Sequence, residues 1–175
     1  MIIVTILGKS GCGKSTLEKQ FEDNGYNRLI SYTTRDMRAG EEQDREYHFV
    51  TRERFKELVN SGAIVEQVVY NNNLYGSPGV DGHDRNVAVV ESDGLEKLTE
   101  IYKDSIFSVY IKVSDEEIER RLNKRNNTTD IRARKLEDNK KFDNIQSKVT
   151  LVVDGNNSPS DIFRIISEEI SRRNI

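Results

Sequence analysis

Met1–Ser15 reads MIIVTILGKSGCGKS, and this segment sets the architecture expected for the whole chain. Ile2 to Leu7 is an apolar run, typical of a strand that is covered on both faces. Residues 8–15 then match G-x-x-x-x-G-K-[ST] at every fixed position, and residues 14–22 are predicted to form a helix. A strand, a glycine-rich turn and a helix in this order predict a phosphate-binding loop, or P-loop.

The chemistry of such a loop follows from its backbone. Glycines allow N–H groups to converge on phosphate oxygens, and the start of the helix adds partial positive charge. Lys14 would supply charge to the β- and γ-phosphates, and the hydroxyl of Ser15 would be a ligand of Mg²⁺. We therefore expect ATP and Mg²⁺ to bind here. The ATP-binding residues expected from the motif are Gly8, Ser10, Gly11, Cys12, Gly13, Lys14, Ser15 and Thr16.

Beyond the loop, strand-like and helical segments alternate over most of the chain. This order predicts an α/β fold of the P-loop NTPase type, with a parallel sheet flanked by helices. The expected strands are 28–31, 63–70, 74–75, 87–90, 106–113 and 149–153. The expected helices are 51–61, one from about 95, 114–125, 131–146 and one that begins at Ser158-Pro159.

The middle of the chain interrupts this alternation. Residues 32–86 contain short strands and one helix, so we interpret them as an inserted acceptor-nucleotide lobe. The core is then expected from residues 1–31 and 87–175, in a single-domain protein whose helical lid covers 121–136.

The composition excludes several classes of protein. The chain has 175 residues, a net charge of −3 and one cysteine. No apolar run approaches the ~20 residues that cross a bilayer, and a negative net charge argues against general nucleic-acid binding. We expect a cytoplasmic protein, a monomer or weak homo-oligomer. Cys12 lies among loop amides at a helix N-terminus, where the pKa of a thiol is expected to fall, and an inert loop thiol is the alternative.

A P-loop alone does not fix the reaction, because GTPases, ATPases and kinases share it. A GTPase also needs a DxxG switch and an NKxD segment. No glycine here has Asp three residues before it, and Asn123-Lys124 and Asn139-Lys140 are not followed by Asp at the required position. These absences favour a kinase.

A second polar motif follows the first helix: Ser31-Tyr-Thr-Thr-Arg35-Asp-Met-Arg38-Ala-Gly40-Glu41, and then Tyr47-His-Phe49. Two arginines three residues apart, with hydroxyl groups around them, suit a phosphate monoester, because guanidinium groups donate paired hydrogen bonds to phosphate oxygens. The lobe is therefore expected to bind a phosphorylated acceptor.

The run S-x-T-T-R-x-x-R-x-G-E…Y-x-F resembles the guanylate kinase family. The resemblance implies transfer of the γ-phosphoryl group of ATP to GMP or dGMP. It also implies that Ser31, Arg35, Arg38 and Tyr47 hold the GMP phosphate, and that Glu41 orients the arginines.

The resemblance extends to the base. Glu66 matches the family's glutamate that accepts hydrogen bonds from guanine N1–H and the 2-amino group. Asn73-Leu-Tyr75-Gly76-Ser77 matches the family's N-x-Y-G-[ST] segment, in which Tyr contacts the phosphate and Ser or Thr contacts the base. A carboxylate that accepts from two guanine donors would disfavour adenine.

The family's lid corresponds to a helix–break–helix pattern rich in cations. The resemblance implies that Arg125 is the first catalytic lid arginine, and that the second lid cation is Arg134 or Lys135. With Lys14 they would stabilise charge on the transferring group.

One segment departs from the family. Where D-x-D-x-Q-G is usual, this chain has Glu91-Ser92-Asp93-Gly94. Glu91 and Asp93 are expected to contact the nucleotide or the waters of Mg²⁺. The departure leaves open a different acceptor, such as another (deoxy)nucleotide or a sugar phosphate. A non-catalytic guanylate-kinase-like binding module is a further alternative, although such modules lose the phosphate loop or the lid cations and residues 8–15 are complete here.

Overall fold

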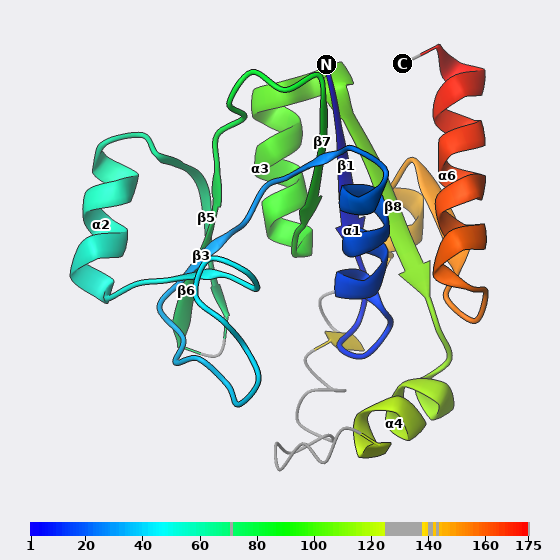
Figure 1. Ribbon diagram of the computed structural model, residues 1–175, viewed down its shortest axis with the longest axis horizontal. Helices are drawn as coiled ribbons and strands as arrows, with labels where there is room; N and C mark the ends of the chain where they lie inside the picture. Colours follow the sequence, from blue (N-terminus) through cyan, green and yellow to red (C-terminus); the bar gives the residue numbers. More distant parts are fainter. Residues whose placement is uncertain (71, 125–137, 140–141, 143, 175) are drawn as a thin grey trace.

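Two sheets organise the computed structural model of the chain, which describes residues 1–70, 72–124, 138–139, 142 and 144–174 (Figure 1). The larger sheet is parallel, with strand order β2-β7-β1-β8-β9. Its strands are β1 (Ile2–Leu7), β2 (Asn27–Arg28), β7 (Arg85–Val89), β8 (Ile106–Lys112) and β9 (Leu151–Asp154). The predicted α/β class with a parallel sheet is confirmed.

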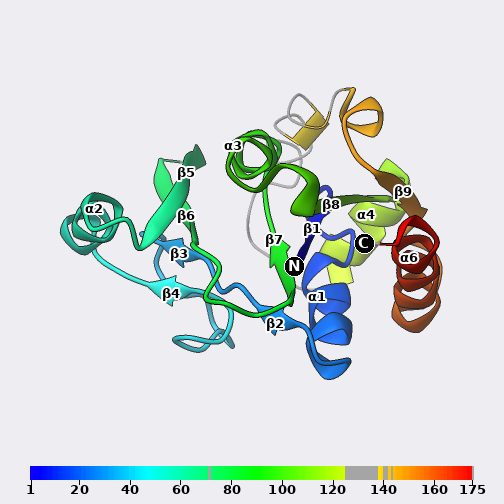
Figure 2. The same ribbon diagram turned by 90° about the horizontal axis from the view of Figure 1, so that it is seen from above.

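Helices cover both faces of this sheet (Figure 2). They are α1 (Lys14–Asp23) and α6 (Pro159–Arg173) on one face and α3 (Ser92–Tyr102) on the other, with short 3₁₀ helices η1 (Lys103–Ser105) and η2 (Ile145–Ser147). Helix α4 (Asp115–Lys124) lies beyond the end of β8 (Figure 1). Because side chains alternate along a strand, Val4 and Ile6 pack with α1 and α6, whereas Ile3 and Leu7 pack with α3. Among the described residues, no helix combines the length and apolar character needed to cross a membrane.

The smaller sheet forms the lobe and has strand order β4-β3-β6-β5. The lobe consists of the strands β3 (Tyr32–Thr33), β4 (His48–Phe49), β5 (Ile64–Tyr70) and β6 (Asn73–Pro78) and the helix α2 (Arg52–Asn60). Thr51 caps α2 by accepting a hydrogen bond from the N–H of Arg54 at 3.2 Å, and Gly62 follows the helix at a φ of +77°. Phe55, Leu58 and Ile64 give the lobe a separate small core.

Several boundaries differ from the sequence expectation. The strand expected at 28–31 is limited to Asn27–Arg28, and the helix expected from about residue 95 begins at Ser92. At the start of α4, Ser114 accepts from the N–H of Glu117 at 3.3 Å, and the carboxylate of Glu117 binds Arg120 and Arg121. Most of the expected helix 131–146 lies outside the described residues, and its end at Ile145 is 3₁₀ rather than α-helical.

The core has no room for a side chain at Gly155, directly after β9. A Cβ atom there would lie 2.4 Å from Cγ2 of Val113 and 2.6 Å from Cγ2 of Ile111. We therefore expect Gly155→Ala to lower the free energy of unfolding by about 1–3 kcal/mol, as overpacked core substitutions do. Urea denaturation measures this change.

Gly79→Ala is the matched control, because its Cβ would meet Val65 at the milder distance of 3.3 Å. We expect a smaller loss there. Equal stability of Gly155→Ala and wild type would show that this corner is packed less tightly than the distances indicate.

Candidate functional site

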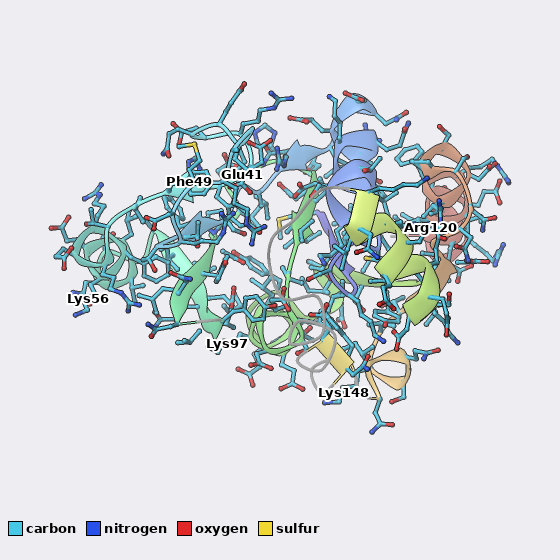
Figure 3. The ribbon with its side chains drawn as sticks, turned by 90° about the horizontal axis from the view of Figure 1, so that it is seen from below. Glu41, Phe49, Lys56, Lys97, Arg120 and Lys148 are labelled. Atoms are coloured by element: carbon cyan, nitrogen blue, oxygen red, sulfur yellow. The ribbon has the colours of Figure 1, made fainter. Side chains whose placement is uncertain are left out.

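A cavity of about 540 Å³ lies between the phosphate loop, the face of α1 and the lobe. Figure 3 looks onto this end of the molecule, with Glu41 and Phe49 on the lobe and Arg120 on the side of α4 that faces away from it. The structure brings most of the predicted residues to the cavity wall. Those that line it are Ser10, Gly11, Lys14, Ser15, Ser31, Arg35, Arg38, Glu41, Tyr47, Glu66, Tyr75, Ser77 and Glu91.

Five predicted residues do not line the cavity: Gly8, Cys12, Gly13, Thr16 and Asp93. Gly8, Cys12 and Gly13 belong to the loop backbone, whereas Thr16 and Asp93 are exposed. The predicted lid cations Arg125, Arg134 and Lys135 lie outside the described residues.

The glycines of the phosphate loop are required by its shape. Gly11 and Gly13 have φ values of +84° and +109°, which L side chains rarely adopt. A Cβ atom on Gly8 would lie 2.5 Å from Sγ of Cys12. The Nζ of Lys14 donates to the carbonyl oxygens of Gly8 and Lys9, so the lysine folds over its own loop.

The expectation for Cys12 is wrong. Its side chain is 2% exposed and packs in the core with Leu122 and Val153. Burial raises the pKa of the Cys12 thiol, and this effect outweighs the opposing charge of Lys14. The loop places the sulfur beneath its backbone rather than at the surface, so a low-pKa, accessible thiol is not formed.

Residues far away in the sequence hold the loop from outside. Arg121 donates to the carbonyl oxygens of Cys12 at 3.2 Å and Gly155 at 2.9 Å. Asp138 accepts from the N–H of Ser10 at 2.8 Å. Lys9 forms an ion pair with Asp115 at 2.7 Å. Sequence reasoning missed these contacts, because no spacing rule links residues that lie 34 to 128 positions apart.

On the lobe, Glu41 organises the two arginines. Arg35 donates from Nη1 and Nη2 to the two carboxylate oxygens of Glu41, each at 2.9 Å, and the N–H of Arg38 donates to the same carboxylate at 2.8 Å. Burial alone would raise the pKa of Glu41, but these hydrogen bonds hold it below the usual value. The carboxylate is therefore ionised near neutral pH and fixes the guanidinium group of Arg35.

Two tyrosines stand beside this pair. The rings of Tyr47 and Tyr75 are 5.8 Å apart, and the guanidinium of Arg35 lies 5.5 Å from the ring centre of Tyr47. Burial, and then the neighbouring Tyr75, raise the pKa of Tyr47 to about 12. The phenol consequently keeps its proton and can donate a hydrogen bond.

Glu66 has the most unusual environment in the cavity. Only 5% of the residue is exposed, and its Oε2 accepts from the hydroxyl of Ser77 at 2.8 Å. Its Oε1 is buried and has no hydrogen-bond partner among the described residues. Burial raises the pKa of Glu66, while Ser77 and the charge of Lys97 act in the opposite direction. A buried acceptor without a partner is destabilising, so this oxygen indicates a ligand with a hydrogen-bond donor.

Glu91 and Asp93, the two acids of the segment that departs from the family's pattern, have different surroundings. Glu91 is the N-cap residue of α3 and lines the cavity, but its side chain does not cap the helix. Asp93 lies in the first turn and points to solvent, although its charge still contributes to the raised pKa of Glu66. Only Glu91 is thus positioned to face a bound ligand directly.

The cavity also contains an ion pair that no sequence motif indicated. Glu18 of α1 is 5% exposed, and its Oε2 lies 2.8 Å from Nε of Arg28 on β2. Both residues line the cavity. The only sequence signal was an acid at a position where the amphipathic pattern of α1 expects an apolar residue.

Comparison with known proteins places these observations in a family. A sequence model described as "Guanylate kinase" matches residues 1–169. The curated guanylate kinase of Anaplasma phagocytophilum is 35% identical over 133 residues, which cover 69% of this chain and 62% of that protein. The guanylate kinase of Sus scrofa is 36% identical over 138 residues, covering 73% of this chain and 69% of that protein. The chain thus spans less than two thirds of the length of the Anaplasma relative.

Solved structures agree on the fold. The crystal structure of the Anaplasma phagocytophilum guanylate kinase covers 99% of this chain and 85% of its own, with a TM-score of 0.76 and 24% sequence identity. A gluconokinase from Sinorhizobium meliloti shares the fold more distantly, with a TM-score of 0.58, 14% identity and coverage of 98% and 92%. From the match over residues 1–169 and the identity to its curated relatives, this chain belongs to the guanylate kinase family.

Proposed function

We propose that the protein is a guanylate kinase that transfers the γ-phosphoryl group of ATP to GMP or dGMP. The observation that carries this proposal is the buried Glu66 carboxylate, whose Oε1 has no partner among the described residues. It lies in the same cavity as the phosphate loop and the acceptor arginines.

Guanine fits this carboxylate for a simple chemical reason. Its N1–H and 2-amino groups are adjacent donors on one edge, and a carboxylate can accept from both. Ser77 already holds Oε2 of Glu66, so the carboxylate is oriented before the ligand arrives. Adenine would present the lone pair of an unprotonated N1 to the same oxygen, which opposes binding.

The acceptor phosphate is assigned to the lobe side of the cavity. Arg35 and Arg38 would neutralise its charge, and Ser31, Tyr47 and Tyr75 would donate hydroxyl groups to its oxygens. Glu41 would keep Arg35 in place, as it does in the free protein. A site that is oriented in advance loses less conformational entropy on binding.

The donor is assigned to the phosphate loop. The backbone N–H groups of residues 8–16 would bind the phosphates of ATP, with Lys14 leaving its loop carbonyls to reach the β- and γ-phosphates. Mg²⁺ prefers oxygen ligands, and the Ser15 hydroxyl and the Glu91 carboxylate both line the cavity. When bound, the ion would neutralise charge on the donor phosphates.

Catalysis in this arrangement needs no general base. Phosphoryl transfer depends mainly on positioning the two nucleotides in line and on stabilising charge. Lys14 would serve this purpose, and we assign the same role to Arg125 and to Arg134 or Lys135 from the family resemblance.

The direct test measures ADP release from ATP and Mg²⁺ in a coupled assay, across GMP, dGMP, AMP, CMP, UMP and a sugar phosphate. We expect activity with GMP and dGMP, since their base edges are identical. Equal activity with AMP or a pyrimidine nucleotide would exclude the guanine assignment and leave a kinase with another acceptor. Absence of turnover with every acceptor would favour a binding module.

The first predicted variant removes the loop cation. Lys14→Ala should lower kcat at least ~100-fold, because it deletes a charge that stabilises the transition state. The affinity for GMP, measured by calorimetry, should change little. Lys56→Ala, on the exposed surface of α2, is the control and should behave as wild type. Near-normal turnover by Lys14→Ala would contradict the donor assignment.

The second predicted variant tests base choice. Glu66→Gln keeps the shape of the side chain but turns one acceptor into an N–H donor that faces the guanine donors. Wild type should prefer GMP over AMP by at least ~100-fold in kcat/KM, and the variant should lose most of this ratio through GMP alone.

Glu100→Gln, an exposed acid-to-amide change on α3, controls for the loss of charge. It should leave both substrates unaffected. A Glu66→Gln protein that retains the full GMP/AMP ratio would show that another residue reads the base.

A further inference from the structure

The pair formed by Glu18 and Arg28 has no role in the function proposed so far. Glu18 belongs to the helix that follows the phosphate loop, and Arg28 belongs to the edge strand beside β7. Their side chains are 6% and 17% exposed, so the contact between Nε and Oε2 at 2.8 Å is shielded from bulk water.

Fold stability does not explain this pair. The attraction between two buried charges offsets the free energy lost on desolvation only when the geometry is excellent and further hydrogen bonds are made. Apolar residues of similar size often stabilise a core equally well or better. The geometry here is incomplete, because Nε of Arg28 makes no well-aligned hydrogen bond. Burial raises the pKa of Glu18 to about 7 even though Arg28 acts in the opposite direction.

Arg28 differs from Arg35 of the lobe in which of its hydrogen-bond donors are already engaged. Both Nη groups of Arg35 are engaged by Glu41. Arg28 meets Glu18 through Nε, and neither of its Nη groups makes a hydrogen bond to any residue that the structure describes. These Nη donors belong to a side chain that lines the cavity. A guanidinium fixed at one edge and open at the other can bind an oxyanion through its fork of N–H groups.

The position of the pair points to the acceptor phosphate. Glu18 lies one helical turn after Lys14, on the same face of α1, and Arg28 lies three residues before Ser31. The charge of Glu18, like that of Glu91, contributes to the raised pKa of Tyr47, after burial and Tyr75. Glu18 therefore lies near Tyr47, whose phenol is assigned to the acceptor phosphate.

We propose that Arg28 is a third arginine of the acceptor site, held by its ion pair with Glu18 and binding a phosphate oxygen of GMP through its Nη groups. The inference rests on the proposed function, because it takes GMP as the acceptor. Glu18 is then a positioning residue: its charge offsets that of Arg28 while the cavity is empty and orients the guanidinium group.

The experiment compares the binding of GMP, guanosine and ATP by calorimetry, using the full chain. Its central protein is the double variant Glu18→Met/Arg28→Met, which removes both charges and leaves no buried ion unpaired. The matched control is Arg164→Met/Glu168→Met, which removes an exposed ion pair of α6 with a distance of 3.1 Å. Arg28→Lys keeps the charge but loses the fork.

We expect the central variant to bind GMP about 10- to 100-fold more weakly than wild type, the usual effect of losing a charge-assisted contact. Its affinities for guanosine, which lacks the phosphate, and for ATP should stay within about twofold of wild type. In turnover, KM for GMP should rise more than kcat falls, because the contact exists before and during transfer. Arg28→Lys should recover part of the loss, and the α6 control should match wild type.

Three results would overturn the role of Arg28 while leaving the proposed function intact. The first is an unchanged affinity for GMP in the central variant. The second is an equal loss of affinity for guanosine, which would indicate a damaged base pocket. The third is a loss of affinity for ATP rather than for GMP. A wild-type protein that binds ATP but not GMP would instead remove the proposed function, and this inference with it.

Discussion

The rest of the site depends on how the backbone polar groups of the phosphate loop are satisfied. A loop that presents N–H groups to a ligand needs its carbonyl oxygens bound elsewhere. Here Lys14 takes the carbonyls of Gly8 and Lys9, and Arg121 takes that of Cys12. These contacts within the chain satisfy the carbonyl acceptors, and the cavity is built around the loop.

The acceptor side shows a different use of charge. Arg35 and Glu41 hold each other in a bidentate pair, so the lobe keeps its guanidinium in place without a ligand. Glu66 shows the opposite case, because one of its oxygens is buried without a partner among the described residues. The first arrangement fixes a donor in place, whereas the second carries a desolvation penalty that a hydrogen-bond donor from a ligand would relieve.

Two buried carboxylates in the cavity wall, Glu18 and Glu66, lie where burial is unfavourable for a charged group. Glu18 and Glu66 both have raised pKa values, with burial as the largest cause. Both line the same cavity. Residues that disfavour the folded state on their own are commonly retained where they contact a ligand.

The sequence by itself predicted the parallel sheet, the P-loop motif and most of the residues that the structure places at the cavity wall. Two motifs, residues 8–15 and 31–41, are continuous in sequence. Their chemistry can be predicted because the residues that define each motif lie close together along the chain. Strand alternation likewise depends on local periodicity. Even so, the low thiol pKa expected for Cys12 was wrong, because motif position does not report burial.

Only the tertiary structure decided which groups meet across long separations and which lose contact with water. Arg121 reaches the loop from more than 100 positions away, and Glu18 meets Arg28 between a helix and an edge strand. Asp93 looked equivalent to Glu91 in sequence, yet the earlier start of α3 turns it to solvent. These outcomes depend on the packing of elements against one another and on the desolvation that packing causes. Neither effect is encoded in the spacing of residues along the chain.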